Sequence, residues 1–219
     1  MLDALGTLLR FEPPAPHLRA ALRARGIEVS EAAAEAAIRA EIAYYRAHLH
    51  EGRDAASLAG LRERSAEAMR PALGVGGPLT DALLEALRFH AYPDAAPALR
   101  ALRDRGLRLV VVSNWDASLH ERLEETGLAP LVDGAVASAE LGVAKPDRAI
   151  FAHALALAGV PAEAALHVGD SAREDVEGAL AAGLRAVLVQ RGGAPPPGVR
   201  AIGSLAELPA LCAYPSSAT

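Results

Sequence analysis

Six polar side chains that could take part in catalysis or metal binding follow predicted β-strands or lie in the loops after them. Three are carboxylates, and the others are a hydroxyl, an amide and an ammonium group. Ligands of open parallel sheets bind in the crevice beyond the carboxyl ends of the strands. Carboxylate oxygens suit Mg²⁺, and a carboxylate beside a metal and a lysine stays ionised and can act as a nucleophile. The six residues are Asp3, Ser113, Asn114, Lys145, Asp170 and Asp175.

Lys145 is the single lysine of the chain, which contains 21 arginines. Arginine therefore serves at every other position that needs a permanent positive charge. A lysine ammonium is a compact point charge, whereas the guanidinium of arginine is a planar fork. We therefore expect Lys145 to occupy a site that accepts the compact group and not the fork.

Short apolar segments alternate with helical segments from about residue 91 onward. Strand-like runs span residues 107–112, 135–137, 165–168 and 186–189. Helices are predicted over 94–105, with Asp94 as N-cap, from a capping box of Ser118 and Glu121 to Gly127, over 146–158, and over 171–182. Repeated β-α-β units of this length imply a parallel sheet with helices on both faces. The predicted fold class is α/β, with a doubly wound, Rossmann-like core.

Residues 13–90 follow a different pattern. Apolar residues such as Leu18, Leu22 and Ile38 recur at helical spacing, and no convincing strand interrupts them. We predict an inserted all-helical cap of three to five helices. The resulting domains are a core of residues 1–12 and 91–211, a cap of residues 13–90 and a tail of residues 212–219.

Composition excludes several classes of protein. With 219 residues, 52% of them hydrophobic and 22% charged, the chain has a globular composition. A formal charge of −5 gives no general affinity for nucleic acid. Cys212 is the single cysteine, so an internal disulfide is excluded, and no apolar run is long enough to span a membrane. We expect a cytoplasmic protein, and these features specify no oligomeric state.

The position of Asp3 raises a separate expectation. A central buried strand usually has about 4–8 residues, yet only Met1 and Leu2 precede Asp3. We therefore expect the natural protein to begin upstream of Met1.

Four segments resemble, in order and spacing, motifs one to four of the haloacid dehalogenase superfamily. The helical insert lies between motifs one and two, where subfamily IA members carry a helical first-position cap. Each segment alone is a weak signal, but the four in order, each associated with a strand, are a strong one. The segments are Asp3-Ala4-Leu5-Gly6-Thr7-Leu8, Ser113-Asn114, Lys145-Pro146, and Gly169-Asp170-Ser171 through Asp175.

This resemblance implies roles for the catalytic groups. Asp3 would be the nucleophile that forms an aspartyl intermediate on a small phosphorylated substrate. Ser113 would hydrogen-bond the transferred group, and Lys145 would balance the charge of Asp3 and of the phosphoryl oxygens. Asn114 would contact substrate beside Ser113, or would only form hydrogen bonds within its loop.

The resemblance also implies a Mg²⁺ site. Asp3, the backbone carbonyl of Leu5 and Asp170 would ligate the metal directly. Asp175 would hold metal-bound water or Lys145. The alternative for Asp175 is that its charge simply favours the first turns of a helix.

Leu5 departs from the pattern of the phosphatase branch. Those enzymes carry a second Asp two residues after the nucleophile, which protonates the leaving oxygen and helps to activate water. Leucine can do neither, and losing a general acid/base lowers the rate by about 10²–10⁴-fold. Magnesium binding should survive, because the metal ligand at this position is a backbone carbonyl.

Three interpretations of function follow from Leu5. The chain is a slow Mg²⁺-dependent phosphohydrolase, or one that takes its acid from water or a cap residue. Alternatively, it resembles the 2-haloacid dehalogenases, in which halide leaves without protonation. Against this stands Gly169-Asp170-Ser171, which is the metal-binding form of motif four. The third interpretation is a binding or interaction module that has lost catalysis.

Other side chains are secondary candidates. Trp115 and Asp116 directly follow motif two and could touch substrate, although packing under the cap is the favoured interpretation of Trp115. Tyr45 and Arg46 lie on a predicted cap helix and could select substrate. His167 lies in a predicted buried strand and is interpreted as a satisfied core residue.

Overall fold

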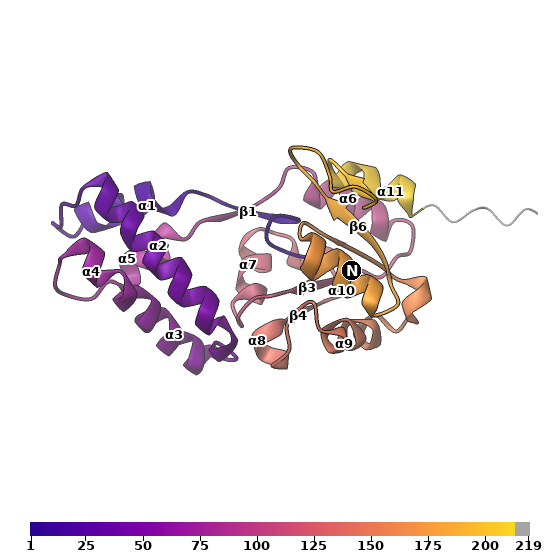
Figure 1. The fold of residues 1–219 in the computed structure, drawn as a ribbon, viewed down its shortest axis with the longest axis horizontal. Helices are drawn as coiled ribbons and strands as arrows, with labels where there is room; N and C mark the ends of the chain where they lie inside the picture. Colours follow the sequence, from indigo (N-terminus) through magenta and orange to yellow (C-terminus); the bar gives the residue numbers. More distant parts are fainter. Residues whose placement is uncertain (213–219) are drawn as a thin grey trace, which may run out of the picture.

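The computed structural model describes residues 1–212, which form two lobes (Figure 1). One lobe is helical, and the other is a parallel sheet flanked by helices. Within the described residues, no helix has the length and apolar character that a membrane span requires. The helices of the helical lobe are α1 (Pro14–Arg23), α2 (Glu31–His48), α3 (Ala55–Ala68), α4 (Arg70–Leu73) and α5 (Thr80–Ala86).

The parallel sheet is joined at its centre by the first residues of the chain. Leu2 forms parallel bridges with both Val111 and Val168. Its N–H donates to the Val110 carbonyl at 2.9 Å, and the N–H of Asp3 donates to the Val168 carbonyl at 2.8 Å. The strand order is therefore β4-β3-Leu2-β5-β6-β7. These strands are β3 (Val110–Ser113), β4 (Gly134–Ala137), β5 (Leu166–Gly169), β6 (Arg185–Val189) and β7 (Ala201–Ile202).

Helices cover both faces of this sheet. Successive residues of β3 point to opposite faces. Val111 packs in one core cluster with Leu99 and Leu119, whereas Val112 packs in a second cluster with Phe151. The doubly wound α/β fold predicted from the sequence is confirmed. The helices of this lobe are α6 (Ala95–Arg103), α7 (Leu119–Glu125), α8 (Ser138–Leu141), α9 (Arg148–Ala158), α10 (Gly178–Ala181) and α11 (Leu208–Leu211).

A two-stranded antiparallel ribbon connects the two lobes (Figure 1). It pairs β1 (Leu9–Phe11) with β2 (Phe89–Ala91), and the rings of Phe11 and Phe89 stack at 4.9 Å. The expectation of no strand within residues 13–90 is therefore wrong at residues 89 and 90. A three-residue strand is too short to show the alternation by which strands are predicted. The domain boundaries themselves stay a prediction.

The helical lobe has its own apolar core. Its buried residues come from all five helices of this lobe and from the segments between them, and they include Leu18, Leu22, Ile38, Met69 and Leu83. Helix α2 begins at Ser30, whose side chain accepts a hydrogen bond from the N–H of Ala33. The helical periodicity of the sequence thus corresponds to one buried face on each of the longer helices.

Two predicted helix caps have the predicted position, but their side chains form no cap hydrogen bond. Asp94 is the N-cap residue of α6, but its side chain accepts hydrogen bonds from Arg191 and from the N–H of Leu205 and none from α6. The Ser118 hydroxyl pairs with the indole Nε1 of Trp115 at 3.1 Å and forms no capping box with Glu121. Asp94 is bound by a residue 97 positions away, whereas Ser118 is bound by a residue only three positions before it.

Two element boundaries also differ from prediction. Strand β3 begins at Val110, so residues 107–109 of the predicted strand lie outside it. The predicted helix of residues 171–182 is instead a π-helical turn over Ala172–Glu177 followed by α10. Cys212 lies directly after α11 and packs against the sheet core. Residues 213–219 of the predicted tail lie outside the described residues.

Candidate active site

Asp3 is the meeting point of three segments that are distant in sequence. It follows the central Leu2 at the carboxyl edge of the sheet and is 5% exposed. The hydroxyl of Ser113, the last residue of β3, donates to Asp3 Oδ1 at 3.0 Å. Lys145 Nζ donates to the same oxygen at 2.7 Å. The parallel strands end at one edge, which places these groups together.

Lys145 lies in a loop after β4 and α8, and its ammonium group joins two carboxylates. Besides Asp3, Lys145 Nζ contacts Asp175 Oδ1 at 2.6 Å. Only 1% of the lysine side chain is exposed. Burial opposes the charged form of Lys145, but the carboxylates of Asp3 and Asp175 outweigh it and raise its pKa. The ammonium group therefore stays charged across the physiological pH range.

Asp3, Asp170 and Asp175 form a cluster of carboxylates suited to a divalent cation. One oxygen of each lies within 4.8 Å of the others. Burial raises the pKa of Asp3, although Lys145 opposes this shift. Burial and then the charges of Asp3 and Asp175 raise the pKa of Asp170 to about 7. When all three carboxylates are ionised, one ammonium leaves two negative charges unbalanced, and an all-oxygen donor set of this charge fits Mg²⁺.

Asp175 is fixed by more than its lysine partner. Its Oδ1 also contacts His167 Nε2 at 2.8 Å, and its Oδ2 accepts the N–H of Ser171 at 3.0 Å. Burial opposes ionisation of Asp175, but the hydrogen bond from His167 and the charge of Lys145 outweigh it and lower its pKa. The carboxylate thus faces the lysine as an ionised partner, in agreement with one of its two roles implied by the resemblance.

His167 is fully buried beside Asp175. Burial lowers its pKa to about 4, so the imidazole is neutral. Its Nε2 therefore carries the proton donated to Asp175, and its Nδ1 has no hydrogen-bond partner among the described residues. The interpretation of His167 as a fully satisfied core residue is wrong at this nitrogen. His167 therefore orients Asp175, while its own Nδ1 is an acceptor without a partner among the described residues.

Asn114 holds the loop that carries Lys145. Its Oδ1 accepts the N–H of Lys145 at 2.7 Å, and its Nδ2 donates to the Lys145 carbonyl at 3.0 Å and to Glu174 at 3.1 Å. This is the loop-bonding alternative for Asn114. A contact with substrate stays a prediction, and the contact with Glu174 was not predicted from sequence.

Two glycines allow the carboxylates to approach the backbone. Gly6 has a φ of +84°, and a Cβ atom there would overlap the carboxylate of Asp170. A Cβ atom on Gly169 would overlap the carboxylate of Asp175. Residues with side chains would therefore displace both carboxylates, which explains why glycine is needed in motifs one and four.

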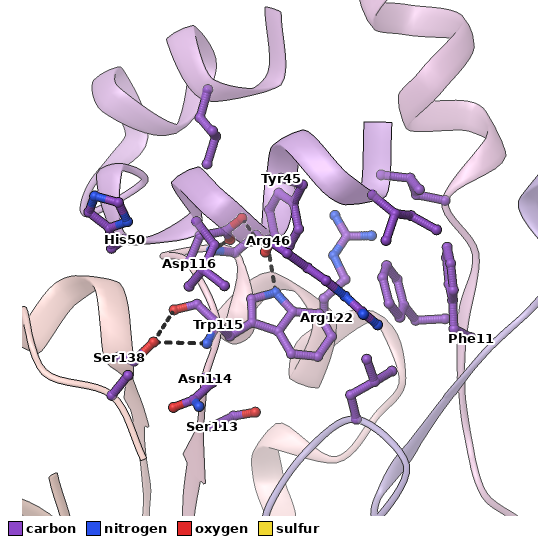
Figure 2. Close-up of a pocket in the computed structure, with 18 of the residues that line it drawn as sticks. Phe11, Tyr45, Arg46, His50, Ser113, Asn114, Trp115, Asp116, Arg122 and Ser138 are labelled. Atoms are coloured by element: carbon purple, nitrogen blue, oxygen red, sulfur yellow. Dashed lines mark hydrogen bonds between the residues drawn. The ribbon is translucent and has the colours of Figure 1, made fainter. Parts of the chain in front are cut away.

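A cavity of about 900 Å³ lies between the two lobes and includes the carboxylate cluster among its walls. In Figure 2, Tyr45 and Arg46 line it from the helical lobe, and Ser113, Asn114 and Trp115 line it from the sheet lobe. Asp116 lines the cavity as well.

Contacts across this cavity join the lobes. The Tyr45 hydroxyl donates to Asp116 Oδ2 at 2.8 Å. Trp115 is buried, and its ring packs 5.2 Å from that of Phe89 in the connecting ribbon. Trp115 therefore packs against the connecting ribbon, and because it also lines the cavity its contact with substrate stays a prediction. Asp116 is bound by the helical lobe.

Leu5 is exposed to the cavity beside the nucleophile candidate. Its side chain is 42% exposed and belongs to the cavity wall. The position that carries the second Asp of the phosphatase branch thus presents an apolar surface. No proton donor is available from this residue.

Glu41 is a cavity residue that the sequence analysis missed. It lies on the buried face of α2, is 4% exposed and lines the cavity. Burial alone raises the pKa of Glu41 to about 7. Its position in the sequence gave a signal, because Ala34, Ala37 and Ile38 place it on the apolar stripe of the helix at i+7, i+4 and i+3.

Comparison with known proteins agrees with these features. A family model described as haloacid dehalogenase-like hydrolase matches residues 1–183. A phosphoserine phosphatase of Thermus thermophilus is 42% identical over 109 residues, which are 49% of this chain and 44% of that protein. The haloacid dehalogenase-like hydrolase domain-containing protein 3 of Mus musculus is 32% identical over 205 residues. This second match covers 85% of this chain and 79% of the mouse protein.

Solved structures show the same fold. The crystal structure of a dehalogenase with an intermediate complex is similar, with a TM-score of 0.69 and 26% identity. The match covers 97% of this chain and 96% of that one. The arrangement of sheet and helical lobe is therefore shared over nearly the whole chain.

The buried carboxyl of Glu41 leads to a prediction about stability. Because folding raises its pKa from about 4.5 to about 7, the folded state holds a proton that the unfolded state has lost between these pH values. Stability should therefore fall as the pH rises from 5 to 8, by about 2–3 kcal/mol relative to the Glu41→Gln variant. Urea unfolding of both proteins at pH 5 and pH 8 measures this difference. Glu35→Gln, at an exposed position of the same helix, is the control, and parallel behaviour of native and Glu41→Gln proteins would contradict the prediction.

Proposed function

This chain belongs to the haloacid dehalogenase-like hydrolase family, and we propose that it is a Mg²⁺-dependent phosphohydrolase of a small phosphorylated metabolite. The observation that carries the proposal is the shared contact of Asp3 with Ser113 and Lys145, within reach of two further carboxylates. The similarity to a protein named phosphoserine phosphatase supports the reaction class. The substrate itself is not defined by these features.

Asp3 is the proposed nucleophile. Its carboxylate oxygen forms a bond to phosphorus while the bond from phosphorus to the leaving oxygen breaks. Water then attacks phosphorus in the aspartyl phosphate, releases inorganic phosphate and regenerates Asp3. In both steps Ser113 and Lys145 donate hydrogen bonds to the charged oxygens, and Lys145 keeps Asp3 ionised.

Asp3, Asp170 and the backbone carbonyl of Leu5 would hold Mg²⁺, with Asp175 acting through Lys145 or metal-bound water. When bound, the ion supplies positive charge that neutralises the phosphoryl oxygens. The Gly6 and Gly169 positions support this assignment, since both let a carboxylate approach the backbone. Magnesium dependence rests on this donor set and on the net charge of the cluster.

Leu5 determines which substrates react fastest. An alkoxide leaving group needs a proton, and the apolar side chain of Leu5 cannot supply one. Aryl and acyl phosphates have leaving groups that need little protonation, so we expect them to be the best substrates. A 2-haloacid dehalogenase activity is the second candidate, because Leu5 is apolar and a dehalogenase structure is similar over nearly the whole chain.

A release assay with Mg²⁺ and with EDTA tests the proposed function. We expect Mg²⁺-dependent release of phosphate from aryl and acyl phosphates, at least tenfold faster than from alkyl phosphates, because protonation limits the latter. Equal rates on aryl and alkyl phosphates would contradict the role given to Leu5. Chloride release from 2-chloropropionate in EDTA would indicate a dehalogenase. Stabilisation by Mg²⁺ without any turnover would indicate a binding module.

Leu5→Asp should restore a proton donor. The exposed position of Leu5 in the cavity wall allows a carboxyl group to face the leaving oxygen. We expect turnover of alkyl phosphates to rise at least tenfold, within the range of about 10²–10⁴ that a general acid contributes. Leu5→Asn is the matched control, since it is polar and of similar size but cannot exchange a proton. An equal gain in both variants, or none in either, would show that the acid is supplied elsewhere.

Lys145→Arg should abolish activity without unfolding the protein. The ammonium group lies 2.7 Å from Asp3 and 2.6 Å from Asp175, and the longer planar guanidinium cannot keep both contacts in a site with 1% exposure. We expect a loss of roughly 10²-fold or more in kcat, with the far-ultraviolet circular dichroism spectrum retained. Arg148→Lys, an exposed exchange at the start of α9, controls for the change of cation type. An active Lys145→Arg variant would refute the argument from the single lysine.

A further inference from the structure

The end of the cavity inside the helical lobe contains two polar groups among apolar neighbours. Glu41 belongs to α2 and Ser65 belongs to α3. Both side chains line the same cavity as the carboxylate cluster. The apolar residues around them are Ile42, Leu61, Leu83, Leu84 and Leu87.

Neither polar group has a protein partner. Ser65 is 2% exposed, and its Oγ has no hydrogen-bond partner within residues 1–212. Glu41 is 4% exposed, and its carboxyl group forms no hydrogen bond or ion pair within residues 1–212. Buried polar groups are nearly always hydrogen-bonded, because an unpaired one destabilises the folded state. Two unpaired groups on neighbouring helices, facing one cavity, indicate that a ligand is their partner.

Two nearby side chains that could pair with Glu41 are engaged elsewhere, and a third, Arg46, lies five residues after Glu41 on α2 and forms no ion pair with it. Tyr45 lies one helical turn after Glu41, but its hydroxyl donates to Asp116. Arg62 also lines the cavity, but its guanidinium pairs with Glu121 at 3.0 Å. Within the described part of the chain, no cation acts on the Glu41 carboxyl.

Glu41 lies apart from the reacting carboxylate. Glu41 lies within α2 of the helical lobe, whereas Asp3 lies at the carboxyl edge of the sheet, and Tyr45, one turn nearer the end of α2, is a residue that contacts the sheet lobe. A proton donor must come within about 3 Å of the leaving oxygen, directly or through one water. Glu41 therefore faces the organic part of a substrate whose phosphoryl group lies at Asp3, and it does not replace the missing acid.

We infer that Glu41 and Ser65 bind a positively charged amino group on the leaving-group portion of the substrate. This inference rests on the proposed function for the orientation of the phosphoryl group. An ammonium group has three donors and no acceptor. It satisfies the carboxylate and the serine oxygen together, and its charge is balanced by Glu41 in a site with low water access.

An alcohol fits this site less well than an amine does. A hydroxyl has one donor, so it leaves either the Glu41 carboxylate or the Ser65 oxygen without a hydrogen-bond donor. It also carries no charge to balance an ionised carboxylate. The apolar residues around the pair contact the carbon atoms between the amine and the phosphate ester.

A matched pair of aryl phosphates tests the inference. In 4-(aminomethyl)phenyl phosphate an ammonium group replaces the terminal methyl group of 4-ethylphenyl phosphate. We expect the native protein to favour the amine at least tenfold in kcat/KM, mainly through KM. Glu41→Gln should bring this ratio to near one, and Ser65→Ala should reduce it about threefold. Glu35→Gln, on the exposed side of α2, should leave the ratio unchanged.

Binding of the corresponding phosphonates separates this inference from the proposed function. Isothermal titration calorimetry with the native protein compares 4-(aminomethyl)phenylphosphonate with 4-ethylphenylphosphonate and requires no turnover. Tenfold tighter binding of the amine, lost in Glu41→Gln, supports the inference even if no ester is hydrolysed, in which case the proposed function fails. Hydrolysis of both esters at equal efficiency, with equal binding of both phosphonates, overturns the inference and leaves the proposed function standing. The preference of the native protein decides between these outcomes even if Glu41→Gln does not fold.

Discussion

The ammonium group of Lys145, shared between the buried carboxylates of Asp3 and Asp175, is the interaction on which the site depends. Each carboxylate alone would be an unfavourable buried charge, and removal of one member of such a buried pair destabilises a protein by about 3–5 kcal/mol. Neighbouring residues hold these three side chains in position. Asn114 fixes the backbone of Lys145 from both sides, and His167 orients Asp175. The charges are therefore held in place before any substrate binds.

The parallel sheet explains how such distant residues come together. Leu2 bridges β3 and β5, so the segments that end in Asp3, Ser113 and Gly169 lie next to one another. A helical lobe inserted after the first of these segments then covers the same edge of the sheet (Figure 1). The hydrogen bond from Tyr45 to Asp116 crosses between the lobes near the cavity. The sheet therefore assembles the reacting groups, and the inserted helices enclose the space beside them.

The sequence predicts the parts of this arrangement that follow from local periodicity and chain order. Buried strands such as β3, the helical insert and the carboxylates after the strands are of this kind. It could not predict features that depend on tertiary contacts. Asp94 is a good helix cap by type, yet Arg191, 97 residues away, binds its side chain instead. Glu41 was missed because a charged residue on an amphipathic helix is usually exposed, although its spacing from Ala34, Ala37 and Ile38 places it on the apolar stripe of α2.

Leu5 and Glu41 both differ in polarity from the residue expected at their positions. We assign the two positions to different parts of the substrate. An apolar side chain stands where a proton donor is expected, and a carboxyl stands where the apolar stripe of α2 requires a hydrophobic residue. On the proposed function, the first departure weakens catalysis for poor leaving groups. The second offers contact with a part of the substrate that does not react, and such remote binding energy can be used to position the reacting group. Substrate selectivity would then depend on two properties of the leaving group. One is whether it departs without protonation beside Leu5, and the other is whether it carries a positive charge that binds Glu41.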